Sequence, residues 1–306
     1  IHRLAAIMAS DVVSTEVVCQ VILASNSMER GWHDDRNAFA RAWSLVRGAP
    51  LLELALTHDW DHTETRGGKR VLERYFDGLQ QLMLAAKEQF GTIEKIGEEI
   101  AGCIARGGII HAFGSGHSDM IAREITGRAG GLVPVNRIID PMQGSAERVE
   151  GFAEALLKRY EKTSSLNQGE IMVIISNSGR NALPIEMCLE AKKRGLMTIA
   201  VTSLAYSTQA ASRHSGGKNL YEISDYVVDN YVNFGDTLIA LPESELKSGP
   251  GSTIMGALLV NMMMLSAIGK IRETGDELPI LKSMNMDGAD EHNELLLSKY
   301  KGRLSW

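Results

Sequence analysis

Runs of apolar residues that end in polar turns recur along this chain and predict buried strands followed by helices. The clearest run is Ile171–Ile175, in which five apolar residues follow one another without alternation, as in a parallel strand buried on both faces. The polar turn Ser176–Gly179 comes next, and Asn181 can cap a helix that accommodates Pro184 in its first turn. We therefore expect a strand, a polar turn and a helix N-terminus in succession.

A second apolar run, Ile109–Phe113, leads into the turn Gly114–Ser118 and a further helical pattern. It is not a dinucleotide-binding fingerprint, because Asp119 stands where the third Gly is required, and it lacks the Gly-Lys-Ser/Thr of a Walker loop. Two such turns at the carboxyl ends of strands predict one phosphate held between them by N–H groups and hydroxyls. The candidate ligands are Ser115, Gly116, His117, Ser176, Asn177, Ser178, Gly179 and Asn181.

The alternation of strand-like and helical patterns continues along the chain. Four further apolar segments predict strands, namely Leu132–Val135, Met197–Val201, Tyr226–Asp229 and Thr237–Leu241. Apolar residues at helical spacing predict two helices before the first strand, one beginning near Leu72 and one that contains Ile93 and Ile104. Because strands alternate with helices, we expect an α/β domain with a doubly wound, mostly parallel sheet.

The segment Ser248–Thr253 precedes a helix that is apolar on nearly every side. Such a helix is buried, in the core or in a subunit interface, and its run Ile254–Ile268 is shorter than the roughly 20 residues of a membrane span. The hydroxyls of Ser252 and Thr253 are further candidate ligand donors at the start of this helix.

Composition narrows the possible partners and compartment. The net charge of −6 over 306 residues argues against a nucleic-acid or anionic-membrane surface. Three widely spaced cysteines, Cys19, Cys103 and Cys188, fit a reducing cytoplasm and show no metal-ligand spacing. We expect a cytoplasmic protein with no metal and no redox cofactor.

Residues 1–70 are patterned differently from the rest. His58 and His62 are four residues apart, so a helix would place them on one face as a metal pair requires, although a solvated segment is the simpler interpretation. A second hypothesis is that residues 1–70 are a translated leader, since Arg66–Val71 could be encoded by a purine-rich ribosome-binding site followed by a GTG start. We expect an irregular extension over residues 1–70 and one domain over 71–306.

Several motifs resemble those of the SIS (sugar isomerase) family of phosphosugar-binding proteins. The motifs are G-S-G-H-S, I-S-N-S-G-R-N, A-R-E-I-T-G-R (Ala122–Arg128), S-G-P-G-S-T-I-M-G-A (Ser248–Ala257) and N-M-D-G-A-D-E-H-N (Asn285–Asn293). The third resembles the helix of phosphoheptose isomerases, and the fourth resembles a helix start of the N-acetylmuramate 6-phosphate etherases. The fifth resembles the tail of uncharacterised bacterial SIS-domain proteins that are labelled phosphoheptose isomerases. The sequence departs from the family at Asn181, where Thr or Ser is usual.

This resemblance implies a fold, an assembly and a reaction. The implied fold is a five-stranded, flavodoxin-like three-layer domain with leading helices, assembled as a homodimer or homotetramer. The implied reaction is aldose–ketose isomerisation of a phosphorylated sugar through an enediol. Glu124 would remove the proton beside the carbonyl, and His292 would return or relay a proton.

Two alternative functions remain open. The helix start at Ser248–Ala257 favours a lyase that cleaves a lactyl ether from an amino-sugar phosphate. A non-catalytic phosphosugar sensor would keep Ser115, Ser176 and Ser178 but would tolerate the loss of Glu124. A transcription regulator is disfavoured, because the sequence shows no helix-turn-helix pattern and no basic face.

Overall fold

The computed structural model describes residues 68–241 and 244–306, and all the elements below belong to the compact unit Thr65–Trp306. The leader hypothesis and the possible metal pair His58 and His62 lie outside the described residues.

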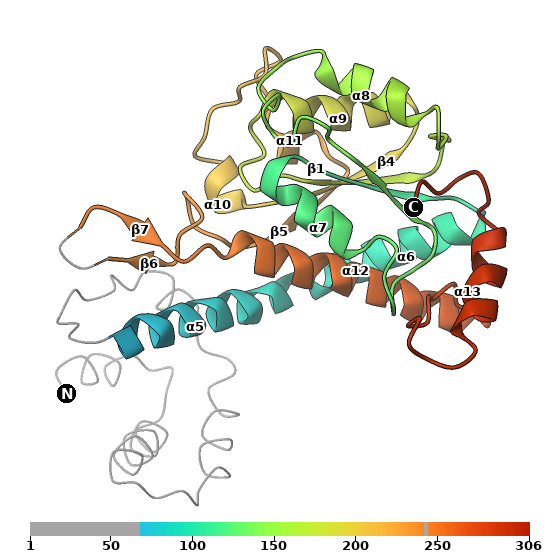
Figure 1. Ribbon diagram of the computed structural model, residues 1–306. Helices are drawn as coiled ribbons and strands as arrows, with labels where there is room; N and C mark the ends of the chain where they lie inside the picture. Colours follow the sequence, from blue (N-terminus) through green and yellow to red (C-terminus); the bar gives the residue numbers. More distant parts are fainter. Residues whose placement is uncertain (1–67, 242–243) are drawn as a thin grey trace, which may run out of the picture. The chain divides into compact units, whose positions relative to one another are not determined.

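A five-stranded parallel sheet forms the centre of this unit (Figure 1). Its order is β2-β1-β3-β4-β5, which confirms the expected doubly wound fold. The strands are β1 (Ile110–Gly114), β2 (Val135–Ile138), β3 (Ile171–Ile175), β4 (Met197–Thr202) and β5 (Tyr226–Asp229). Because all strands are parallel, their carboxyl ends meet at one edge of the sheet.

Helices cover both faces of the sheet and bury alternate residues of each strand. Val173 of β3 belongs to the core formed with α6, α7 and α12, whereas Ile174 belongs to the core formed with α8, α9 and α11. The first group is α6 (Phe90–Ala105), α7 (Asp119–Glu124) and α12 (Ser252–Thr274). The second group is α8 (Phe152–Tyr160), α9 (Ala182–Lys193) and α11 (Leu220–Ile223). This arrangement is the three-layer architecture that the resemblance implied.

The remaining elements are short or peripheral. The leading helix α5 (Gly68–Ala85) continues through η1 (Ala86–Gln89) into α6, in agreement with the predicted leading helices. The others are η2 (Gly116–Ser118), α10 (Leu204–Ser207), β6 (Ile239–Ala240), β7 (Lys247–Ser248) and α13 (Ala289–Ser298).

The helix α12 is the one helix in the described part of the chain that is long and apolar enough to span a membrane, by length and composition alone. It packs against α6, and the two helices approach each other closely at Gly97. A Cβ atom there would lie 2.2 Å from the Ser266 hydroxyl oxygen. Met255, Leu259 and Met263 of α12 are buried in the core, as expected for a helix that is apolar on nearly every side.

Two predicted strands differ from the observed ones. The second strand begins at Val135, because Leu132 instead forms an antiparallel bridge with Ile280, and Pro134 has no N–H to donate. The segment Thr237–Leu241 contributes only Ile239–Ala240 (β6), which pairs with β7 in a small hairpin outside the main sheet.

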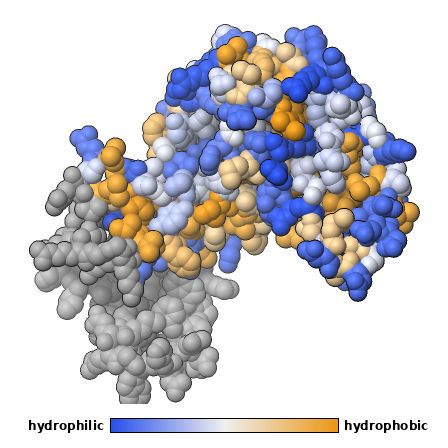
Figure 2. Space-filling model, in the orientation of Figure 1, coloured by the Kyte–Doolittle hydropathy of each residue, from blue (hydrophilic) through white to orange (hydrophobic). Residues whose placement is uncertain are grey.

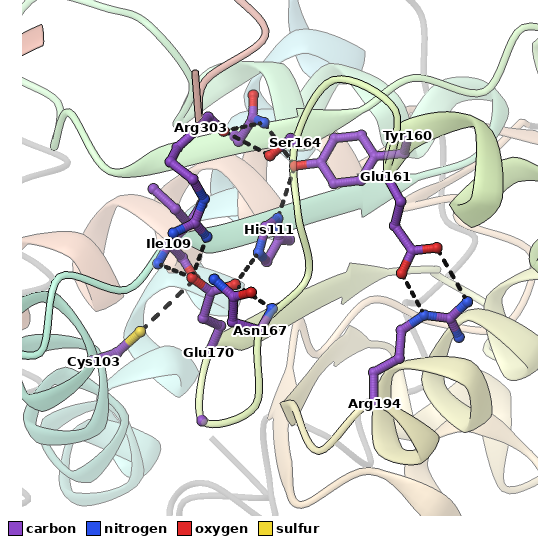
Figure 3. A network of polar contacts seen from close by, with 12 residues as sticks. Cys103, Ile109, His111, Tyr160, Glu161, Ser164, Asn167, Glu170, Arg194 and Arg303 are labelled. Atoms are coloured by element: carbon purple, nitrogen blue, oxygen red, sulfur yellow. Dashed lines mark hydrogen bonds and ion pairs between the residues drawn. The ribbon is translucent and has the colours of Figure 1, made fainter. Parts of the chain in front are cut away.

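A buried polar network lies at the amino ends of β1 and β3 (Figure 3). His111 donates from Nε2 to Glu170 at 3.0 Å and accepts at Nδ1 from the Tyr160 hydroxyl at 2.8 Å. The Glu170 carboxylate also accepts from the Ile109 amide and pairs with Arg303. Burial lowers the pKa of His111, outweighing the opposite effect of its bond to Glu170. Burial would raise the pKa of Glu170, but the bonds from His111, the Asn167 amide and Arg303 prevail and lower it to about 2.

Candidate functional site

A pocket opens at the carboxyl edge of the sheet, between the ends of the strands and the N-terminal ends of α7 and α12. Its lining residues are His117, Ser118, Ile121, Ile175, Asn177, Val201, Asn230, Asp236, Ser252, Thr253 and Gly256. Four predicted ligand residues are therefore brought together, namely His117, Asn177, Ser252 and Thr253. They come from three separate segments, which the parallel sheet and α12 hold next to one another.

The turn after β3 owes its shape to a glycine and several hydroxyls. Gly179 has φ +60°, and a Cβ atom there would lie 2.9 Å from the hydroxyl oxygens of Ser207 and Thr202. The Gly179 amide donates to the Ser176 hydroxyl at 3.3 Å, and the Ser207 hydroxyl donates to the Ser178 carbonyl at 2.9 Å. The Ser176 hydroxyl and Gly179 thus stabilise the turn and do not line the pocket. The turn's pocket residue is Asn177.

The side chain of Asn177 is paired with a second amide in the pocket. Asn230, which directly follows β5, donates from Nδ2 to the Asn177 Oδ1 atom at 2.8 Å. The pair presents amide groups suited to sugar hydroxyls, which both donate and accept hydrogen bonds.

The turn after β1 is held by a buried carboxylate. Ser115 donates its hydroxyl to Asp140 at 3.0 Å, and Asp140 also accepts from the amides of Met142 and Gly144. Gly116, with φ +55°, lies against Gly144. The Ser115 hydroxyl is therefore engaged inside the protein, whereas His117 and Ser118, one helical turn further on, reach the pocket.

The N-terminus of α12 already carries an anion. Asp236 accepts from the amides of Gly251 and Ser252 through Oδ1 at 3.0 and 2.9 Å, and from the Ser252 hydroxyl through Oδ2 at 2.6 Å. This carboxylate satisfies N–H groups that have no partner within the helix. A phosphate at the same position would be repelled by Asp236, so this end of the pocket is better suited to hydroxyl groups.

The predicted ligand Asn181 has its side chain directed elsewhere. It occupies the N-cap position of α9 but makes no capping bond with its side chain. Its Nδ2 donates to Glu147 at 2.6 Å, and its Oδ1 accepts from Arg213 at 3.0 Å. In this arrangement Asn181 fastens two loops to α9, and a contact with phosphate stays a prediction.

Within one chain, neither of the two predicted catalytic residues lines the pocket. Glu124 ends α7, less than one turn beyond the lining residue Ile121, where it pairs with Arg128 and accepts from the Asn261 amide at 2.9 Å. His292 donates from Nε2 to the Ile280 carbonyl at 2.9 Å. Since Ile280 bridges to Leu132, ahead of β2, His292 lies toward the amino edge of the sheet, opposite the pocket. Their catalytic roles stay predictions.

The polar residues that sequence reasoning missed are Ser118, Asn230 and Asp236. A usable signal existed for Asn230, because it directly follows the predicted strand Tyr226–Asp229, and ligands sit at the carboxyl ends of strands. His117 and Asp236 are the potential metal ligands among the lining residues. A group of three such ligands, Glu150, Glu186 and His214, lies elsewhere in the described part of the chain.

Three kinds of comparison relate this chain to known proteins. A model of the SIS domain matches residues 74–203. A UPF0309 protein of Geobacillus thermodenitrificans is 37% identical over 244 residues, covering 76% of this chain and 96% of the relative. A UPF0309 protein of Streptomyces avermitilis is 36% identical over 247 residues, covering 77% and 97%. A solved phosphoheptose isomerase from Francisella tularensis has a TM-score of 0.44 at 14% identity, covering 65% of this chain and 100% of that one.

Proposed function

The chain belongs to the UPF0309 family and carries a SIS domain, and from this premise we propose that it binds a phosphorylated sugar and interconverts its aldose and ketose forms. The observation that carries the proposal is the pocket at the carboxyl edge of the parallel sheet. Its polar lining comes from the turn after β1, the turn after β3, the end of β5 and the start of α12. Ligands bind at this edge in open α/β sheets.

The charges of the pocket suggest how the ligand is oriented. The Asp236 carboxylate occupies the N-terminus of α12, so the phosphate belongs at the opposite side, beside His117, Ser118 and the turn that contains Asn177. The sugar hydroxyls then face Asp236 and the amide of Asn230. Both groups can accept hydrogen bonds from hydroxyls.

The proposed chemistry is proton transfer through an enediol. Glu124 takes the proton from the carbon beside the carbonyl, and His292 relays a proton, with a factor of about 10²–10⁴ expected from each such step. Because both residues lie outside the pocket of their own chain, the proposal requires that these groups reach the ligand in an assembly of chains. A homodimer or homotetramer is therefore part of the proposal.

The full chain should be incubated with a panel of aldose and ketose phosphates in deuterated water, with NMR detection of exchange at the carbon beside the carbonyl. We expect exchange for at least one sugar, reduced about 10²–10⁴-fold by Glu124→Gln with binding largely retained. Asn177→Ala should weaken binding instead. Glu154→Gln, which changes an exposed carboxylate of α8, is the matched control.

A second candidate function, a non-catalytic phosphosugar sensor, is favoured because two carboxylates that could serve as bases are already engaged within the protein. The carboxylate that lines the pocket, Asp236, caps α12, and Glu124 is paired with Arg128 and Asn261. Binding without exchange, unchanged by Glu124→Gln, would establish the sensor and exclude the isomerase. Release of lactate from N-acetylmuramate 6-phosphate in the same panel would instead identify the lyase.

A further inference from the structure

Two carboxylates and an imidazole converge on the α8–α9 face of the domain. One potential ligand atom from each of Glu150, Glu186 and His214 lies within 4.8 Å of the other two. Glu150 precedes α8, Glu186 lies in α9, and His214 lies in the connection between α10 and α11. Segments that are far apart in the sequence thus direct ligand-type atoms toward one point.

Both carboxylates accept hydrogen bonds from neighbouring groups. Glu150 accepts from the Ser215 amide and hydroxyl at 2.6 and 2.7 Å, and Glu186 accepts from the Gly151 amide at 2.6 Å. Among residues 68–241 and 244–306, the one basic group within ion-pair distance of either carboxylate is His214, with its Nε2 atom 3.8 Å from Glu186. His214 accepts at Nδ1 from the Gly216 amide at 3.0 Å. Among the described residues, no Lys or Arg side chain pairs with either carboxylate, so a bound cation would add a positive charge that their hydrogen bonds do not supply.

We propose that Glu150, Glu186 and His214 form a site for a divalent transition-metal ion such as Zn²⁺. Imidazole nitrogen and carboxylate oxygen are both ligands of Zn²⁺, and three protein ligands can leave a fourth position open. Ligand atoms bound to a tetrahedral Zn²⁺ lie about 3.4 Å apart, so the three atoms must close in by up to about 1.4 Å. Glu150 is exposed, and its movement toward the ion would exchange hydrogen bonds from Ser215 for coordination.

Coordination has a specific consequence for the loop. A neutral imidazole that binds metal through Nε2 carries its proton on Nδ1, so the Gly216 amide must turn away from that nitrogen. Neither Gly216 nor the neighbouring Gly217 has a side chain to oppose this rearrangement. Binding of the ion is thereby coupled to a change in the backbone next to His214.

The metal would stabilise the connection between α10 and α11. This connection is hydrogen-bonded to the turn after β3. The Arg213 amide donates to the Arg180 carbonyl at 2.8 Å, and the Leu220 amide donates to the Gly179 carbonyl at 2.8 Å. The site is separate from the phosphosugar pocket, and its test does not depend on the proposed function.

The test uses the full chain, stripped with a chelator and titrated with ZnCl2 by calorimetry. We expect one equivalent bound, and at least tenfold weaker binding in each of His214→Gln, Glu150→Gln and Glu186→Gln. Co²⁺ should give the absorption spectrum of a tetrahedral site in the unsubstituted chain, and His214→Gln should abolish it. Glu154→Gln, which changes an exposed carboxylate of α8 that pairs with Lys158, should leave both signals unchanged.

A double variant distinguishes this site from the histidines near the start of the chain. His58→Ala/His62→Ala should retain the bound equivalent. If the double variant loses the bound equivalent and His214→Gln retains it, the proposal is overturned. Absence of stoichiometric binding to the unsubstituted chain would overturn it as well.

Limited proteolysis adds a readout of the connection itself. Arg213 and Lys218 are exposed in this segment, so trypsin should cleave there. Zn²⁺ should slow this cleavage in the unsubstituted chain and have no effect in His214→Gln. Equal protection in both proteins would contradict the proposed placement of the ion.

Discussion

At the scale of single residues, Gly179 sets the shape of the turn that presents Asn177 to the pocket. Its φ of +60° disfavours any residue with a side chain, and a Cβ atom would lie 2.9 Å from two hydroxyl oxygens. Gly179→Ala should therefore lower the free energy of unfolding by about 1–3 kcal/mol. Urea denaturation of both proteins measures this change.

Gly269→Ala provides the matched comparison for this prediction. Gly269 lies inside α12 and has no atom within 4 Å of the added Cβ position. Since Ala is the better helix former, this substitution should raise the free energy of unfolding by up to about 1 kcal/mol. Equal effects of the two substitutions would mean that the turn after β3 tolerates a side chain.

At the scale of elements, the network around His111 fastens the C-terminal segment to β1 and β3. The lowered pKa of His111 means that the folded protein binds fewer protons than the unfolded chain below about pH 6.5. Stability from this group is thus present above pH 6.5 and is lost as the pH falls below it. Glu170, with its pKa lowered to about 2, adds a further loss from pH 4.5 downward.

His111→Gln tests this pH dependence, because Gln can donate and accept hydrogen bonds but does not titrate. The free energy of unfolding should fall more steeply between pH 7 and pH 5 in the unsubstituted chain than in the variant. Thermal unfolding at a series of pH values gives both slopes. Parallel slopes would show that His111 is protonated in the folded protein as readily as in the unfolded chain.

Elements were easier to predict from the sequence than the pocket. The unbroken apolar run Ile171–Ile175 predicted β3 correctly, because a strand that is buried on both faces has apolar residues at successive positions. Asn136 and Arg137 of β2 were missed, because their polar side chains are accommodated by tertiary partners: Ser305 donates to Asn136, and Arg137 pairs with Asp119. No local pattern contains such distant partners.

Contacts with residues that are distant in the sequence also decided which pocket residues could be predicted. Asn177 follows a recognisable strand and was predicted, whereas Asp236 belongs to a loop that reaches the pocket only by returning to α12. The engagement of Ser115 with Asp140 likewise depends on a loop that is 25 residues away in the sequence.

At the scale of the whole molecule, hydrophobic side chains remain exposed along the leading helix. Figure 2 shows hydrophobic residues gathered on the face around α5 and the neighbouring part of α12. Leu72 and Phe76 of α5, four residues apart and hence on one helix face, are 71% and 61% exposed within the described unit. Such a face is suited to contact with another copy of the chain.

Charged substitutions on this face should therefore change the assembly. Leu72→Asp/Phe76→Asp should reduce the molar mass measured by light scattering after size exclusion to that of a single chain. Glu73→Lys changes an exposed charge on the same helix and should have no such effect. A single-chain mass for the unsubstituted protein would contradict the expected homodimer or homotetramer.

On each of the two outer strands of the sheet, a side chain bonds to the backbone of one residue, and this bears on aggregation. At β5, the Gln89 side chain donates to the Asp229 carbonyl at 2.6 Å and accepts from the Asp229 amide at 3.0 Å, as a neighbouring strand would. At β2, the Trp306 indole donates to the Val135 carbonyl at 2.8 Å. Exposed strand edges pair readily with other chains. Gln89 and Trp306 therefore hinder the addition of a strand from another chain at these edges. Loss of either side chain would favour fibrils over a dimer or tetramer.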